Sequence, residues 1–377
     1  MFTQRFELFR AFGIPIRIDL SWFLIAFLIT WSLAENVFPD SLPSATSSTL
    51  WILGGVATIG LFASILLHEL AHALIARRHQ LAIRGITLFI FGGVAELEGE
   101  PPDAGAEFRV AIAGPIASVL IGIACIGLTL VIDLLQLPAA AGVVIAFLAS
   151  INFVLVVFNM IPAFPLDGGR VLRSALWNWK KDLRWATRVT SRIGSGFGML
   201  LIVLGIWQFV ARHDLIGGLW TFLIGMFLRN AAHMSYQQLL MRRALEGEPV
   251  SRFMHGDPVT VPRALSVADL VEQYVYRHHY KFFPVVDDGR LVGCVTTRSV
   301  KELPRSEWQR QSVGSITEEC SPSNSIDPSA DAMEALARMS REGISRLMVV
   351  ESGRLVGILA LKDMLGFLAL KVEMEEG

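Results

Sequence analysis

Two histidines and a glutamate stand at metal-site spacing in the stretch His68-Glu69-Leu70-Ala71-His72. At positions i and i+4 of a helix, both imidazoles leave the same face. Such a pair can bind Zn²⁺, and the adjacent Glu69 carboxylate can activate a water molecule on the metal. The alternative is a chance match on a solvated helix face.

The surroundings of this motif favour the metal site. It lies inside an apolar run, Trp51 to Ala76, which is long enough to cross a bilayer as one helix. A charged side chain at mid-membrane costs about 2.5–3.5 kcal/mol. A sequence keeps such groups there when they are paired, hydrated or bound to something, and a membrane helix offers no solvated face for a chance match.

A catalytic zinc site needs a third protein ligand, and Asp167 is the best candidate. It follows two helix-breaking prolines, Pro162 and Pro165, and precedes two glycines that allow a tight turn. Irregular backbone at membrane depth is tolerated where protein or a wet cavity surrounds it. The alternative is that Asp167 simply caps a following helix, expected over Gly169 to Trp179.

The composition divides the 377-residue chain into two parts, although 53% of all residues are hydrophobic and 18% charged. Residues 1 to about 235 are apolar stretches, whereas residues 250–377 have the mixed composition of a soluble domain. The net charge of −1 argues against a nucleic-acid partner. The three cysteines form no CxxC or disulfide pattern.

The N-terminal segment has no clear signal-peptide cleavage site, so its first apolar run is expected to be a retained membrane span. Six spans are expected: about Ser21–Leu33, Trp51–Ala76, Val110–Leu135, Ala141–Met160, Ser195–Ala211 and Leu215–Leu228.

Positive charge is distributed unevenly among the loops. Arginines and lysines gather between Arg77 and Arg109 and between Arg170 and Arg192, whereas Ala34–Leu50 and Gln136–Ala140 contain none. By the positive-inside rule, the basic loops and both termini face the cytoplasm. We therefore expect a multi-pass protein of the plasma membrane.

Together, the two motifs resemble the site-2 protease family of intramembrane metalloproteases. The resemblance covers about residues 5–230 and includes the stretch Asn159-x-x-Pro162-x-x-Pro165-Leu166-Asp167-Gly168. Phe91-Gly92-Gly93 and Ala113-Gly114-Pro115 also fit. The chain departs from the family at Ser118, where an asparagine is often found.

The resemblance implies a role for each of these residues. His68, His72 and Asp167 would bind one Zn²⁺, Glu69 would be the general acid and base, and Asn159 would hold the substrate or the oxyanion. The substrate would be a single-span membrane protein already trimmed on its outer side, such as a membrane-held anti-sigma factor, cut in or near the lipid bilayer.

A transmembrane helix must unwind before it can be cut, because its peptide bonds are shielded. The sequence from Ile86 to Leu97 predicts an extended segment with a bend at Gly92-Gly93. We expect its edge, with Gly92 and Gly93 as substrate-binding residues, to pair with the unwound substrate by strand addition. The alternative is an ordinary amphipathic strand folded onto the protein.

The C-terminal part contains an internal repeat. Residues 285–293 recur at 349–357, 64 residues later, as Val-Val-x-x-Gly-Arg-Leu-Val-Gly, and each copy lies between helix-like stretches. This pattern resembles a tandem pair of CBS domains, whose two sheets pack together. The expected divisions are a membrane domain over 1–235, a linker over 236–249, and CBS domains over 250–305 and 306–377.

CBS pairs often bind adenosine nucleotides through a Gly-x-x-Ser/Thr-x-x-Asp stretch. Here the first copy keeps Thr296 without the aspartate, and the second keeps Asp363 without the hydroxyl residue. Thr296 and Asp363 are the candidate contacts for ATP or AMP. The alternative is a purely structural pair that mediates homodimerisation.

The fold class expected is thus a polytopic α-helical membrane domain with a short membrane-associated β segment, followed by an α/β CBS pair. The function expected is that of an intramembrane zinc endopeptidase. Two alternatives stay open: a CBS-gated ion channel or transporter whose ion path is the cluster of His68, Glu69, His72 and Asp167, and a catalytically dead relative. The spans lack the repeated halves typical of transporters, and all four key residues are intact.

Overall fold

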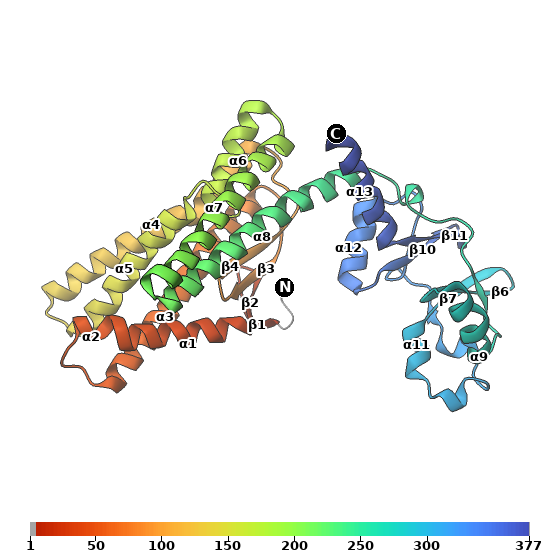
Figure 1. Cartoon of the computed structure of the whole chain (residues 1–377), viewed down its shortest axis with the longest axis horizontal. Coiled ribbons are helices and arrows are strands. Elements are labelled where there is room, and N and C mark those ends of the chain that lie inside the picture. The colour runs from red at the N-terminus through yellow and green to blue at the C-terminus, as the bar shows by residue number, and fades with distance from the viewer. Residues whose placement is uncertain (1–4, 377) are drawn as a thin grey trace. The chain divides into compact units, whose positions relative to one another are not determined.

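The computed structural model describes residues 5–376, apart from the side chains at 98, 243, 368, 369, 371–373, 375 and 376. The chain divides into two units, Met1–Tyr236 and Gln237–Gly377 (Figure 1). The first unit is a helical bundle with a small sheet, and the second contains two smaller sheets with their own helices. We describe each unit by itself.

Six helices of the first unit are long and apolar enough to cross a membrane, which confirms the six predicted spans. Three of them begin clearly earlier than predicted, because side-chain caps at Thr46, Asp103 and Asp182 start these helices in polar sequence. The helices are α1 (Ser21–Ser32, continuing through Leu33–Val37 into α2, Phe38–Ser41), α3 (Ser47–Arg78), α4 (Ala104–Leu134), α5 (Ala139–Asn159), α7 (Leu183–Arg212) and α8 (Leu215–Leu245).

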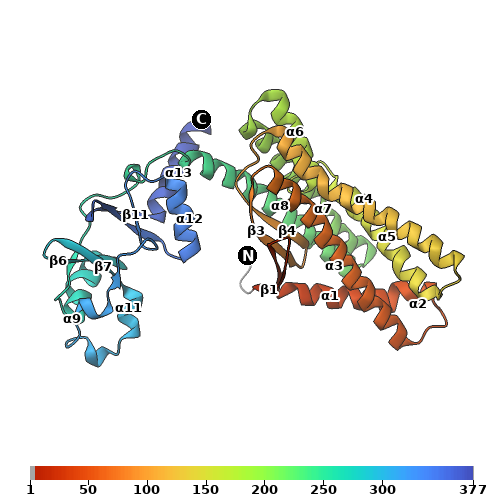
Figure 2. The same ribbon diagram turned by 180° about the vertical axis from the view of Figure 1, so that it is seen from behind.

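The helices α3, α4 and α5 lie side by side and pack on one another, as both views show (Figures 1 and 2). A short helix, α6 (Asp167–Lys180), lies between α5 and α7 in the chain and packs against α4 and α7. Helices α3 and α4 begin at side-chain caps, Thr46 and Asp103, whose oxygens accept the N–H groups of Thr49 and Ala106. These helices carry the site.

A four-stranded sheet packs on α3 at one end of the bundle. Its strand order is β1-β2-β3-β4, so β1 and β4 are the edges. Buried Ile16 and Ile86 of the sheet contact Leu70 and Ala73 of α3. The strands are β1 (Arg5–Ala11), β2 (Ile14–Asp19), β3 (Ala82–Phe89) and β4 (Gly92–Glu98).

The sequence predicted less of this sheet than the structure contains. The segment Ile86–Leu97 is the end of β3 and most of β4, and its turn falls at Ile90 and Phe91, one step before the predicted glycine bend. The turn is held by Phe91, whose ring stacks on Phe227 of α8 at 4.5 Å. The strands β1 and β2 were not predicted. β1 has no alternation of buried and exposed residues, whereas β2 does alternate, so a signal for β2 was present in the sequence and was missed.

The second unit repeats one motif twice, as predicted. Each copy contains a hairpin with a two-residue turn, at Asp288-Gly289 and Ser352-Gly353, where both residues have positive φ angles. The β-bulge also recurs at equivalent positions, Val285/Val286 and Val349/Val350.

The first sheet of this unit has the strand order β5-β6-β7-β8, and the second sheet has the order β11-β10-β9. The strands are β5 (Val261–Pro262), β6 (Phe282–Asp287), β7 (Arg290–Thr296), β8 (Glu318–Glu319), β9 (Ser325–Ile326), β10 (Arg346–Glu351) and β11 (Arg354–Ala360). The helices are α9 (Val267–Asp269), α10 (Tyr276–His278), α11 (Thr297–Glu302), α12 (Ala332–Glu342) and α13 (Leu361–Glu376).

The hydrophobic cores of the two copies are interleaved. Val250 and Phe253, which precede the first sheet, are buried in the core built around the second sheet. Val313, which precedes the second sheet, is buried in the core of the first. Each core is therefore incomplete without a segment from the other copy, so the two copies form one folding unit.

Candidate metal and catalytic site

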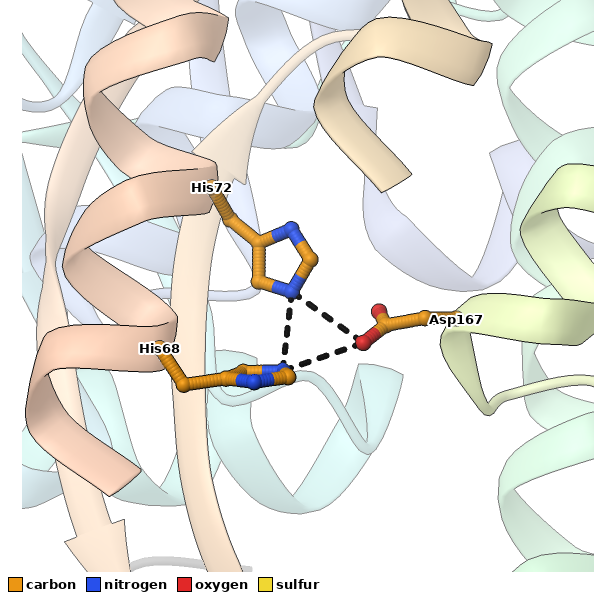
Figure 3. Close-up of side chains that lie close together, drawn as sticks. All are labelled: His68, His72 and Asp167. Atoms are coloured by element: carbon orange, nitrogen blue, oxygen red, sulfur yellow. Dashed lines mark hydrogen bonds and ion pairs between the residues drawn. The ribbon is translucent and has the colours of Figure 1, made fainter. Parts of the chain in front are cut away.

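Three metal-ligating side chains from two distant parts of the chain meet inside the first unit. The His68 and His72 Nε2 atoms lie 3.1 Å apart. The Asp167 Oδ2 atom lies 3.0 Å from the first and 3.2 Å from the second (Figure 3). All three residues are buried. The histidines come from one face of α3, as the i, i+4 spacing predicts, and the carboxylate comes from the start of α6.

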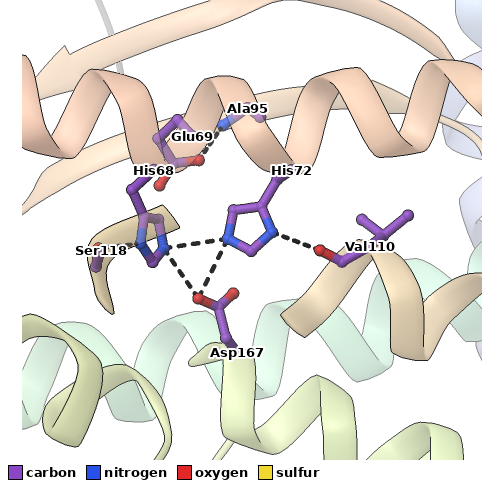
Figure 4. A network of polar contacts seen from close by, with 7 residues as sticks. All are labelled: His68, Glu69, His72, Ala95, Val110, Ser118 and Asp167. Atoms are coloured by element: carbon purple, nitrogen blue, oxygen red, sulfur yellow. Dashed lines mark hydrogen bonds and ion pairs between the residues drawn. The ribbon is translucent and has the colours of Figure 1, made fainter. Parts of the chain in front are cut away.

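Hydrogen bonds on the far side of each imidazole fix its orientation (Figure 4). The His72 Nδ1 atom lies 2.6 Å from the carbonyl oxygen of Val110. Because a carbonyl only accepts, the proton of neutral His72 is on Nδ1, and Nε2 presents a lone pair to the cluster. The His68 Nδ1 atom lies 2.9 Å from the hydroxyl of Ser118, which supports the second ring in the same way.

The geometry fits a tetrahedral zinc ion. With zinc–ligand bonds of about 2.0–2.1 Å, neighbouring donor atoms of a tetrahedron lie about 3.3 Å apart, close to the 3.0–3.2 Å observed here. Helix α4 leaves room for the ion because it has Gly114 at this point. A Cβ atom there would lie 2.2 Å from His72 Nε2 and 2.5 Å from His68 Nε2.

Asp167 does not cap a helix. It is the first residue of α6, the N-cap position is Leu166, and no side-chain hydrogen bond caps the helix. The carboxylate is directed at the histidines instead (Figure 3). This placement requires the backbone to fold back closely, since a Cβ atom at Gly168 would lie 2.3 Å from the carbonyl oxygen of Met160. The glycine after Asp167 is needed for that approach.

Glu69 lies next to the cluster, on α3, and contacts the edge strand β4 (Figure 4). Its Oε2 atom accepts a hydrogen bond of 3.2 Å from the backbone N–H of Ala95. Its stem packs closely on Gly93, where a Cβ atom would lie 2.7 Å from Glu69 Cγ. The structure thus brings Gly93, predicted to bind substrate, beside the predicted acid and base. Gly92 begins β4 with a φ of 127° that favours glycine.

A buried ion pair that the sequence did not reveal lies between α4 and α6. The Arg173 Nε atom donates to Glu107 Oε1 at 2.6 Å, and its Nη2 atom lies 3.5 Å from Glu100 Oε2. Its guanidinium also lies 5.1 Å from the centre of the Phe164 ring, in the loop before Asp167. The pair therefore fixes α6, and with it the carboxylate ligand. The only trace of it in the sequence is Glu107, which lies two turns before Gly114 on the same helix face, and this spacing does not identify Arg173 as its partner.

The hydrogen bonds of this cluster do not include three other predicted residues. Asn159 is the last residue of α5 and is half-buried, and among the described residues its side chain has no hydrogen-bond partner. Thr296 caps α11, with its hydroxyl accepting the N–H of Ser299. Asp363 pairs with His255, whose Nε2 atom lies 3.1 Å from the carboxylate. The two candidate nucleotide contacts thus have different partners.

The six apolar helices make this chain a multi-pass membrane protein. Two histidines, a carboxylate and a neighbouring glutamate inside such a bundle define the class of intramembrane metalloproteases.

Comparisons with known proteins place the chain within this class. The family model of peptidase family M50 matches residues 56–138 and 131–204, and the CBS domain model matches 250–305 and 313–370. A Synechocystis protein, sll0528, named provisionally as a zinc metalloprotease, is 34% identical over 92% of this chain and 91% of its own length. Rip3 of Mycobacterium tuberculosis, also named provisionally as a zinc metalloprotease, is 34% identical over 94% and 90%. A solved site-2 protease from Methanocaldococcus jannaschii is 27% identical, covering 62% of this chain and 95% of that one, with a TM-score of 0.43. The chain belongs to peptidase family M50, the site-2 proteases, and carries a C-terminal CBS pair.

Proposed function

We propose that this metalloprotease hydrolyses peptide bonds of single-span membrane proteins at the cluster of His68, His72 and Asp167. The observation that carries the proposal is the convergence of two Nε2 atoms and one carboxylate oxygen at 3.0–3.2 Å inside a bundle of spans. These three residues would hold the zinc ion. Here Val110 and Ser118 bind the Nδ1 atom of each imidazole and fix the orientation of the ring. A metal site needs such fixed ligands, whereas an ion path does not.

In this proposal the zinc ion and the side chains around it have separate roles. A bound zinc ion would polarise the carbonyl of the peptide bond and lower the pKa of a water molecule. Glu69 would accept the proton of the attacking water and deliver it to the nitrogen that leaves. Val110 and Ser118 would keep the imidazoles oriented, and the Glu107–Arg173 pair would keep Asp167 in place. Asn159, at the end of α5, would contact the substrate.

The substrate would bind as an added strand on β4. Among the described strands, β4 pairs only with β3 and is an edge of its sheet. It begins with Gly92 and Gly93 and runs directly past Glu69. An unwound segment that pairs with β4 would therefore lie beside the acid and base and next to the metal site.

The first experiment compares wild-type protein with Glu69→Gln in detergent or liposomes. Zinc content is measured by atomic absorption, and cleavage is measured on a panel of single-span membrane proteins. We expect about one zinc per chain in both proteins and at least a 100-fold loss of cleavage in the variant, because an amide cannot accept the proton. Absence of metal from both proteins, together with ion conduction, would refute the proposal in favour of a permeation path.

We also propose that both termini and the basic loops face the cytoplasm, with the protein in the plasma membrane. The support is the asymmetry of arginine and lysine among the loops. Cysteine labelling at Ser48, an exposed residue in the first turn of α3 and within the segment that has no basic residues, checks this orientation. After Ser48→Cys, a membrane-impermeant maleimide should label this position from outside in intact cells; labelling only after lysis would reverse the topology.

The CBS pair is proposed to bind AMP or ATP at Asp363 and Thr296 and so to regulate cleavage. The 3.1 Å contact of His255 Nε2 with the Asp363 carboxylate supports a testable refinement, because the imidazole competes with the nucleotide for that carboxylate. We expect His255→Ala to bind AMP about two- to fivefold more tightly, the range of an exposed ion pair, and Asp363→Asn to bind it more weakly. Isothermal titration calorimetry measures both.

His279→Asn is the matched control, since it removes another exposed histidine of the same unit. Its AMP affinity should equal that of the wild type. If none of these proteins binds AMP or ATP, the nucleotide proposal fails, and the pair has only the structural role in homodimerisation.

A further inference from the structure

The carboxylate of Glu69 and the free edge of β4 share one hydrogen bond. The Ala95 N–H donates to Glu69 Oε2 at 3.2 Å and so points away from β3. Alternate residues of an antiparallel strand direct their N–H groups to the same side. Ala95 therefore belongs to the row of N–H groups that a strand added to β4 would use.

We infer that Glu69 and the substrate backbone compete for the Ala95 N–H. In the free enzyme the carboxylate accepts this bond, and when a substrate strand adds to β4, a substrate carbonyl takes it over. The Glu69 Oε2 atom is then released to accept the proton of the attacking water. This inference rests on the proposed function, in which the substrate pairs with β4.

The contacts of Glu69 link strand addition at β4 to release of its carboxylate. The stem of Glu69 lies against Gly93, so that one strand contacts both the stem and the carboxylate. A charged side chain on a free edge is a common device against unwanted pairing of that edge. Here the carboxylate that covers the edge at Ala95 comes from Glu69 of α3, the proposed catalytic base. Only an extended substrate segment could displace the Glu69 carboxylate from the Ala95 N–H and so free it to act as the base. Unwinding of the substrate is therefore a condition for cleavage.

A double-mutant cycle tests the competition. Glu69→Ala removes the competing acceptor, whereas Glu69→Gln keeps a carbonyl oxygen that accepts from Ala95; neither variant cleaves, so binding is measured on intact peptide. The probe is the single-span membrane protein of the panel that the wild-type enzyme cleaves fastest. We expect Glu69→Ala to bind it about two- to tenfold more tightly than Glu69→Gln, the fold-change of one net hydrogen bond.

The ratio should fall to about one in an Ala95→Pro background, which lacks the contested N–H. Leu97→Pro is the matched control, because it removes another N–H of the same row and should leave the ratio unchanged. Zinc content of every variant verifies that the site is folded. Equal affinities of the two Glu69 variants, with wild-type enzyme still cleaving, would overturn the inference alone.

Failure of the wild-type enzyme to cleave any peptide would instead count against the proposed function. Hydrogen exchange at the Ala95 amide then decides the inference by itself. Exchange should be at least several-fold slower in wild-type protein than in Glu69→Ala, and equal rates would overturn it.

Discussion

Replacing Gly114 with alanine is expected to abolish zinc binding and cleavage together. The new Cβ atom would lie 2.2 and 2.5 Å from the Nε2 atoms of His72 and His68, in the space that the ion needs. The neighbours are ring atoms fixed by hydrogen bonds to Val110 and Ser118 rather than the ends of flexible side chains. We expect zinc content to fall from about one per chain to near zero in dialysed protein, and cleavage to fall with it.

The matched control is Gly127→Ala, one residue of the same helix whose Cβ atom would meet nothing within 4 Å. This variant should keep its zinc and its activity, because it makes the same chemical change on α4 without entering the site. A Gly114→Ala protein that binds zinc and cleaves at the wild-type rate would show that the metal lies elsewhere.

Replacing Arg173 with methionine is expected to destabilise the membrane unit by about 3–5 kcal/mol, the usual effect of leaving one charge of a buried pair alone. Glu107 is fully buried and would lose the guanidinium that it contacts. The apparent Tm in detergent should fall on the order of 10 °C. Zinc affinity should fall as well, because Arg173 fixes the helix that begins with Asp167.

The double variant Glu107→Leu/Arg173→Met should regain more than half of the lost stability, since no unpaired charge is then buried. Arg10→Met is the control for losing an ion pair as such, because the pair of Arg10 with Glu7 is exposed and screened by solvent, so its loss should leave the apparent Tm almost unchanged. A double variant as unstable as Arg173→Met would mean that the packing of the arginine, not its charge, holds α6.

The sequence predicted the membrane part of the fold because lipid imposes a simple requirement. A span must be continuously apolar, so both its existence and any polar exception in it are visible without a structure. His68, Glu69 and His72 were such exceptions, and helical periodicity placed the two imidazoles together. Asp167, 99 residues from His68, could be proposed because prolines and glycines mark a broken helix near a bilayer edge.

Other parts of the site had no comparable signal. The carbonyl of Val110 and the N–H of Ala95 are backbone groups, which every residue type supplies, so no sequence pattern marks them. The partner of Glu107 lies 66 residues away, and spacing along the chain could not identify it. The strand β2 pairs with β3 across the whole length of α1 and α3, and β1 joins the sheet only through its hairpin with β2, so no local pattern marks this sheet.

The interleaved cores of the CBS pair limit how this region can change in evolution. Val250 and Phe253 complete the core of the second sheet, and Val313 completes that of the first. A gene truncation between the two repeats would strip residues from both cores at once, so neither repeat would survive as a remnant. The pair should therefore be gained, lost or transplanted between proteins as one cassette, and chimaeras that exchange a single repeat should fail to fold.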